Sequence, residues 1–133
     1  MSQLPSAEPG NIQVVLNLGG ESEVADAIDI NSLVFPLREP GRWIRPGRFI
    51  QADMSALPIR AGVALEVMGR RLPMMSAQDR VAMVGESRRV LTTGGRIRLH
   101  ATSGGGSLWL SFIEDAGFLG CSLISGYAVG TRP

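Results

Sequence analysis

Short apolar runs that end near glycine alternate along this chain with segments of helical periodicity, and this alternation limits the fold more than any other feature. Residues 12–18 and 62–68 are nearly continuous apolar runs, whereas residues 96–101 alternate between polar and apolar side chains. Such runs are typical of strands, and helices between them are expected to cover the faces of a sheet. The pattern predicts an α/β fold with a mostly parallel sheet.

The N-terminal half of the pattern is abbreviated. A second strand is predicted over 25–30, only a few residues after the first, which leaves no room for a crossover helix. Proline, glycine and arginine in 35–48 indicate a loop or broken helix that leads into a short strand at 49–52. We therefore expect an abbreviated connection between the first two strands.

Two helices are predicted in the C-terminal half. Ser76 has the chemistry of an N-cap, and residues 92–95 end the helix that follows it. The apolar stripe of that helix is expected at Ala77, Val81, Val84, Arg88 and Leu91. A second helix is expected from an N-cap at Ser107 to Gly117, and the tail 121–132 is expected to form two short strands or one bent strand.

Composition fits one folded domain. The chain has 133 residues, of which 44% are hydrophobic and 19% charged, and we expect a flexible segment over 1–11 and a single domain over 12–133. The net charge of +1 predicts no nucleic-acid partner. The chain shows no signal sequence and no long apolar segment, so it is predicted to be cytoplasmic and to have no membrane partner. Its only cysteine, Cys121, is expected in the core and gives no sign of an oxidising compartment.

Six segments resemble, in their order and spacing, the shortened members of the class I S-adenosylmethionine-dependent methyltransferases: 15–21, 27–30, 52–58, 86–97, 116–118 and 127–129. The most specific is 86–97, which has the pattern E-x-x-R-V-L-x-x-G-G of a structural turn between a helix and a strand. The resemblance implies a Rossmann-like methyltransferase core with an antiparallel last strand, and S-adenosylmethionine as the cofactor.

The resemblance also implies which residues hold that cofactor. Asp29 would accept both ribose hydroxyls while Ile30 packs on the adenine, and Asp53 would accept the adenine amino group beside Met54. Glu21 stands where the family has glycine, so it either obstructs the methionine moiety or binds its ammonium group. The full predicted set is Asn17, Gly19, Gly20, Glu21, Asp29, Ile30, Asp53 and Met54.

Two departures from the family bear on catalysis. Val63 and Ala64 stand where a phenylalanine and an aspartate are common, which removes a candidate base. The segments that often cover the substrate have no counterpart, so a second copy of the chain or a protein partner is expected to supply a lid.

The acceptor side offers fewer candidates. His100, the single histidine, ends a predicted strand on the ligand side and is either a general base or an ordinary strand-end residue. Tyr127 could reach the same edge. The pairs Arg70-Arg71 and Met74-Met75 stand where a substrate loop begins in the family. The arginines between 38 and 48 form either a phosphate-binding surface or a solvated loop.

Two functions from different classes remain open at this stage. The first is a minimal methyltransferase that acts on a small molecule or a peptide. The second is a degenerate, non-catalytic module of the same fold that binds a protein partner. A Rossmann-type protein for another nucleotide is less favoured, because the Gly19-Gly20 turn lacks the full G-x-G-x-x-G pattern.

Overall fold

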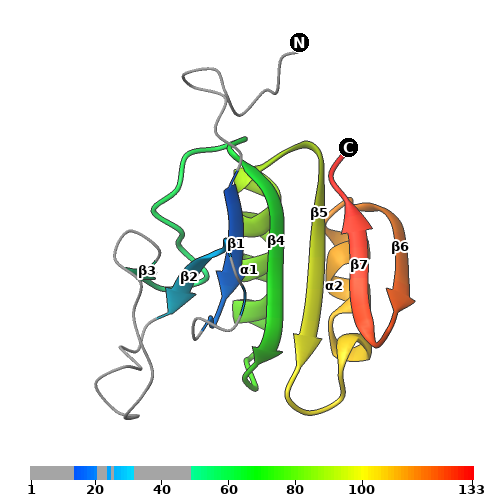
Figure 1. Ribbon diagram of the computed structural model, residues 1–133. Helices are drawn as coiled ribbons and strands as arrows, with labels where there is room; N and C mark the ends of the chain where they lie inside the picture. Colours follow the sequence, from blue (N-terminus) through cyan, green and yellow to red (C-terminus); the bar gives the residue numbers. More distant parts are fainter. Residues whose placement is uncertain (1–13, 21–23, 25, 32–48) are drawn as a thin grey trace.

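The computed structural model describes residues 14–20, 24, 26–31 and 49–133, which form one seven-stranded sheet with its helices on one side (Figure 1). The expectations for 1–11, for the loop 35–48 and for Glu21 lie outside the described residues. The elements are β1 (Val14–Leu18), β2 (Ile28–Asn31), β3 (Phe49–Gln51), β4 (Ala64–Leu72), α1 (Ala77–Val90), β5 (Leu91–Ala101), the 3-10 turn η3 (Gly106–Leu108), α2 (Leu110–Asp115), β6 (Leu119–Ile124) and β7 (Tyr127–Thr131).

The sheet has the strand order β3-β2-β1-β4-β5-β7-β6. The first five strands in this order are parallel, and β7 pairs antiparallel with both β5 and β6. The predicted fold class, a mostly parallel sheet with an antiparallel last strand, is confirmed. The tail is a pair of strands joined by a tight turn at Ser125 and Gly126, both with positive φ, as two-residue hairpins require.

The first helix begins as predicted, but its buried face differs from the predicted stripe. Ser76 Oγ accepts a hydrogen bond from the backbone N–H of Asp79 at 3.1 Å. Ala77 and Val81 are exposed, whereas Met83, Val84, Ser87 and Val90 are buried. The predicted stripe is right at Val84 and Leu91, which are fully buried, and wrong at Ala77 and Val81. The polar Ser87 joins the buried face because its hydroxyl donates to the carbonyl of Met83 at 2.8 Å.

Two boundaries also differ from the sequence expectation. The strand expected from Arg96 begins at Leu91, directly after α1, and turns through Gly94 at a φ of 82°. Ser107 is no N-cap, because it lies inside η3, where its hydroxyl donates to Gly104 O at 2.7 Å. The Gly106 N–H donates a hydrogen bond to Gly126 O, which holds Gly106 in this turn. A Cβ at this position would collide with the backbone of β7.

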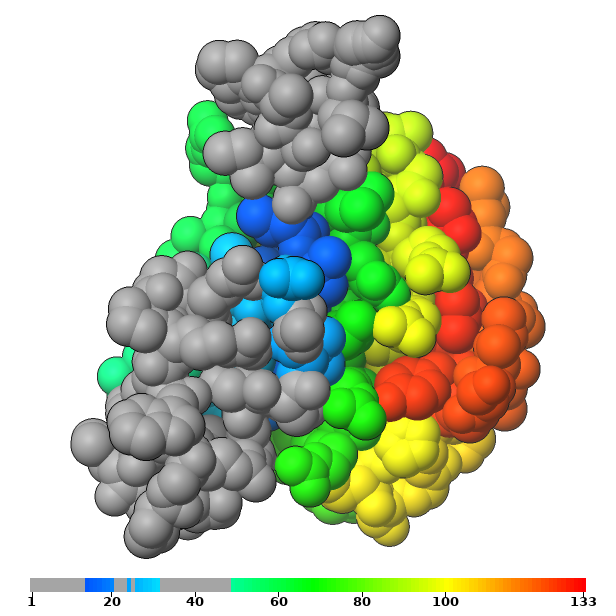
Figure 2. Space-filling view, viewed as in Figure 1, coloured from blue at the N-terminus to red at the C-terminus, as the bar shows by residue number. Residues whose placement is uncertain are grey.

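The two faces of the sheet have different chemistry. Leu16, Val67 and Ile97 are paired neighbours on one face and form the core with the buried residues of α1 and α2, including Ile113. On the second face no helix of the described residues covers the sheet, and β4, β5, β7 and β6 are open to view there (Figure 2). None of the described helices is long and apolar enough to cross a lipid bilayer.

Candidate functional site

Polar groups gather where β1 and β2 end, next to the point at which the strand order reverses. β1 lies between β2 and β4, so the chain winds in opposite directions on its two sides. In open α/β sheets, ligands bind at the carboxyl ends of the strands beside such a switch point. Asn17 and Asp29 are paired across β1 and β2 at this edge, and both side chains point to the second face.

Asn17 and Asp29 are buried and bonded to each other. Their exposed fractions are 0% and 1%, and Asn17 Nδ2 donates to Asp29 Oδ1 at 3.3 Å. The turn after β1 passes close to them, with Gly19 at a φ of 69°. A Cβ added at Gly20 would collide with Asp29 Oδ1, so only glycine lets the backbone approach the carboxylate.

One acceptor in this group lacks a donor among the described residues. Asn17 Oδ1 is buried and has no hydrogen-bond partner within the described part of the chain. Buried polar atoms nearly always have partners. A ligand with hydroxyl or ammonium donors, as S-adenosylmethionine has, fits this acceptor and the neighbouring Asp29 carboxylate.

The structure does not bring every predicted cofactor residue to this pair. Ile30 is fully buried in the core on the opposite face of β2 from Asp29. Asp53 follows β3 and is exposed, and Met54 is partly buried against the core. Asp53 Oδ1 accepts from the Ser55 hydroxyl at 2.7 Å and from its N–H at 2.8 Å, and these bonds lower the pKa of Asp53.

A second polar group, which we call the arginine–tyrosine cluster, lies on the same face over β4, β5 and β7. It consists of Arg70, Arg98, His100 and Tyr127. The His100 and Tyr127 ring centroids are 5.1 Å apart, and the Arg98 guanidinium carbon lies 5.7 Å from the Tyr127 ring centroid. Arg70 Nε donates to the Tyr127 hydroxyl at 3.4 Å, and His100 Nδ1 is buried without a partner among the described residues.

Strand pairing fixes how this cluster stands relative to the Asn17–Asp29 pair. One lateral row runs from Asp29 through Asn17, Met68 and Arg98 to Val129. Adjacent strands are about 4.8 Å apart, so the cluster on β5 begins about 10 Å from Asn17. A ligand of nucleoside size bound at the pair spans that distance. Glu66, which is 15% exposed, holds the Arg98 end of the cluster through a 2.5 Å contact with Arg98 Nε.

The segment 86–97 has a clear structural role. Glu86 accepts from the N–H of Leu57 at 2.8 Å and from Arg89 Nε at 2.7 Å, and Arg89 Nη2 donates to Leu57 O at 3.0 Å. The Arg89 hydrogen bonds, with that of Leu57, hold the pKa of Glu86 below its ordinary value. This Glu86–Arg89 clip ties the loop after β3 to α1.

The remaining candidates carry little chemistry. Cys121 is half-buried, its thiol contacts Phe118 O at 3.2 Å, and burial raises its pKa, which disfavours the thiolate. Within the described ranges, no three His, Cys, Asp or Glu side chains form a group that could hold a metal ion.

Comparisons with known proteins bear on the fold. No family model and no curated protein matches the chain. Among solved structures, a chain in the complex of the Haloferax volcanii Trm112 methyltransferase activator with a methyltransferase is similar, with a TM-score of 0.67 and 12% identity over 91% of this chain and 82% of that one. The aminoglycoside resistance methyltransferase NpmB1 is similar with a TM-score of 0.61 and 18% identity, over 91% of this chain and 87% of that one.

A third similar structure is the 16S rRNA (adenine(1408)-N(1))-methyltransferase from Catenulisporales acidiphilia with its cosubstrate SAM, at a TM-score of 0.57 and 14% identity over 96% of this chain and 87% of that one. This chain has the class I methyltransferase fold. At these identities the likeness concerns the fold.

Sequence reasoning missed two residues of the site. Asn31 is 8% exposed, and its Nδ2 donates to Gly20 O at 3.3 Å, which holds the glycine turn. Arg98 belongs to the arginine–tyrosine cluster. The two-residue period of a strand, counted from Asp29 and from His100, places both on the same face as those candidates.

Proposed function

We propose that this protein is an S-adenosylmethionine-dependent methyltransferase whose cofactor lies at the carboxyl ends of β1 and β2. The observation that carries the proposal is the buried Asn17–Asp29 pair beside a glycine turn, with one acceptor that has no donor in the described part of the chain. When bound, the cofactor supplies a methyl group on a sulfonium, which a nucleophile takes by in-line displacement.

The residues of the chain would bind and orient the cofactor. The Asp29 carboxylate would accept hydroxyl hydrogen bonds from the ribose, and Asn17 Oδ1 would accept a further donor. Asn31 holds the Gly20 carbonyl and so fixes the turn against which the cofactor lies. Asp53 has one oxygen bonded to Ser55, and its other oxygen would accept from the adenine amino group. Glu21, Ile30 and Met54 stay predictions for this site.

The arginine–tyrosine cluster would meet the acceptor, which we propose is a small molecule or a peptide. This cluster lies on the same face as the Asn17–Asp29 pair, and a nucleoside-sized ligand would span the distance from the pair to the cluster. His100 would receive a proton from the acceptor, and Tyr127 would orient it, with Arg70 bonded to the tyrosine hydroxyl. Because one similar structure is a 16S rRNA methyltransferase, RNA belongs among the acceptors tested.

The test is titration calorimetry of the purified protein with S-adenosylmethionine and S-adenosylhomocysteine. Asp29→Asn removes the charge and keeps the shape, and we expect affinity to fall at least about tenfold, because hydrogen bonds to an ionised acceptor are the strong ones. Asp26→Asn is the matched control, an exposed acid three residues earlier, and should leave the affinity unchanged. Equal losses in both variants would contradict the assignment of Asp29.

A second candidate function is a non-catalytic module that binds a protein partner. The open second face over β4 to β7 favours it, and one similar structure comes from a complex with an activator protein. If the folded protein gives no heat with either cofactor at millimolar concentration, this function replaces the first. Transfer of a labelled methyl group to any acceptor, lost in His100→Ala with cofactor affinity intact, would exclude it.

A further inference from the structure

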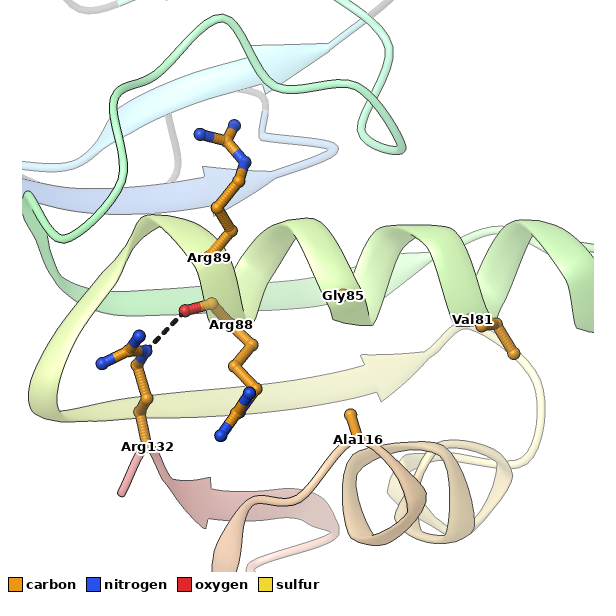
Figure 3. Close-up of a pocket in the computed structure, with 6 residues that line it drawn as sticks. All are labelled: Val81, Gly85, Arg88, Arg89, Ala116 and Arg132. Carbon is orange, nitrogen blue, oxygen red and sulfur yellow. Dashed lines mark hydrogen bonds between the residues drawn. The ribbon is translucent and has the colours of Figure 1, made fainter.

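A hollow lies on the helix side of the molecule, away from the Asn17–Asp29 pair, between α1, the end of α2 and the chain after β7 (Figure 3). Its volume is about 340 Å³, and it is lined by Val81, Gly85, Arg88, Arg89, Ala116 and Arg132. The last turn of α1 stands at the start of β4, where Gly62 N–H donates to Arg89 O. The arginines of the hollow therefore lie at the opposite edge of the sheet from the cofactor site.

Only two of the three arginines are available to a ligand. Arg89 extends to the other side of α1, as Figure 3 shows, and its guanidinium is bonded to Glu86 and to Leu57 O. Arg88 and Arg132 lie together, because Arg132 Nε donates to Arg88 O at 2.8 Å.

These two cations have no counter-charge among the described residues. In the described part of the chain no carboxylate lies within 4.0 Å of either guanidinium, and Arg88 Nε is buried without a hydrogen-bond partner. Arg132 donates hydrogen bonds from Nε to Arg88 O and from Nη1 to Thr93 Oγ1, which leaves Nη2 for a ligand. Two cations that line the same partly buried hollow favour the binding of an anion.

We propose that this hollow binds a phosphate group between Arg88 and Arg132. Two unpaired guanidiniums match the charge of a phosphate monoester near pH 7, whereas a carboxylate neutralises only one. The planar guanidinium fork suits bidentate contact with phosphate oxygens. Val81 and Ala116 add an apolar wall, and Val81 is 61% exposed, so the carbon part of a phosphorylated ligand has a surface to pack on.

The phosphate comes either from a small phosphorylated compound or from the backbone of RNA, and titrations of the full chain distinguish these sources. The probes are inorganic phosphate, pyrophosphate, adenosine monophosphate and a short single-stranded RNA, with citrate as the carboxylate control, all at constant ionic strength. Binding is read from calorimetry and from the ligand-dependent rise in Tm. Saturation by the small phosphates assigns the first source, and a gain of affinity with oligonucleotide length assigns the second.

The variant Arg88→Met keeps the aliphatic stem and removes the charge, and we expect it to weaken phosphate binding by at least about tenfold. Arg132→Gln should weaken it too, with some loss of stability because its bonds to Arg88 O and Thr93 are altered. Arg96→Met is the matched control, an arginine of β5 that is 58% exposed and lies on the opposite face, and it should change affinity less than twofold.

Three results would overturn the proposal. The first is the absence of binding by folded wild-type protein to every phosphate probe. The second is an equal loss in Arg88→Met and Arg96→Met, which would mean an adventitious ion only. The third is citrate binding as tight as pyrophosphate binding. The affinity for S-adenosylmethionine should not change in Arg88→Met, so the outcome is independent of the proposed methyltransferase activity.

Discussion

The half of the sheet that holds β1, β2 and β3 is built differently from the half that holds β4 to β7. The first three strands have 5, 4 and 3 residues, whereas β4 and β5 have 9 and 11. Both described helices come from the second half and pack on its strands. The buried Asn17–Asp29 pair belongs to the first half, whereas the arginine–tyrosine cluster belongs to the second, which also provides the helices and the longest strands of the framework.

The largest expected effect is in the framework. Leu99 on β5 is fully buried in the core, and Leu99→Ala should lower the free energy of unfolding by about 2–5 kcal/mol, because it removes apolar contacts and leaves a cavity. Leu123→Ala on β6, where the leucine is 49% exposed, is the control and should cost less than about 0.5 kcal/mol. Urea unfolding measures both, and similar losses would show that β5 is not the centre of the core.

The next effect concerns the short-strand half. Gly20→Ala places a methyl group against the Asp29 carboxylate, and we expect a loss of about 1–3 kcal/mol from overpacking. Binding of S-adenosylmethionine should be lost with it, because the pair and the turn move apart. A variant that keeps both wild-type stability and binding would contradict the close approach of the Gly20 backbone to Asp29.

The Glu86–Arg89 clip joins the two halves, and its effect depends on pH. The pKa of Glu86 is lowered in the folded protein. The contribution of Glu86 to the free energy of unfolding is therefore fully present above the unfolded-state pKa of about 4.3, and it is lost as the pH falls through the lowered folded-state pKa. Glu86→Gln should cost about 1 kcal/mol at pH 7, allowing for partial exposure, and less at pH 3, because the stabilisation falls as the pH drops through the lowered pKa of Glu86. Urea midpoints at the two pH values test this, with Glu114→Gln on α2 as the control.

The smallest effect has the opposite sign. Gly85 lies inside α1, and a Cβ added there meets no atom within 4 Å. Gly85→Ala should raise the free energy of unfolding by about 0.5–1 kcal/mol, because alanine loses less backbone freedom in a helix. The same substitution thus destabilises at Gly20 and stabilises at Gly85. Thermal unfolding of both variants checks the contrast, which fails if the two midpoints shift in the same direction.

The fold was more predictable from sequence than the details of the site, for reasons visible at single residues. The runs 12–18 and 62–68 and the capping residue Ser76 act locally, and they identified β1, β4 and the start of α1. Ser107 was predicted as an N-cap, but its hydroxyl bonds to a nearby carbonyl, and the polar Ser87 is buried because its hydroxyl does the same. Propensity takes no account of such partners.

Asp29 was a candidate through the resemblance of 27–30 to a family motif, and His100 through its place near the end of a predicted strand. Asn31 and Arg98 were missed although they share those faces. The contact of Arg70 with Tyr127 joins residues from β4 and β7, and the Arg88–Arg132 contact joins α1 to the chain after β7. Such pairs depend on strand order, which local patterns do not encode. The resemblance of 86–97 to a known turn supplied part of that order.

The parallel pairing of β1 with β4 also has a consequence during synthesis. Leu16 pairs with Val67, so β1 leaves the ribosome several seconds before its partner, at roughly 5–20 residues per second over about 50 residues. The strands and helices from β4 onward are contiguous in sequence and are expected to assemble first, and the apolar segment of β1 joins their free edge afterwards. In the nascent chain, that segment is the one that a chaperone would most need to protect.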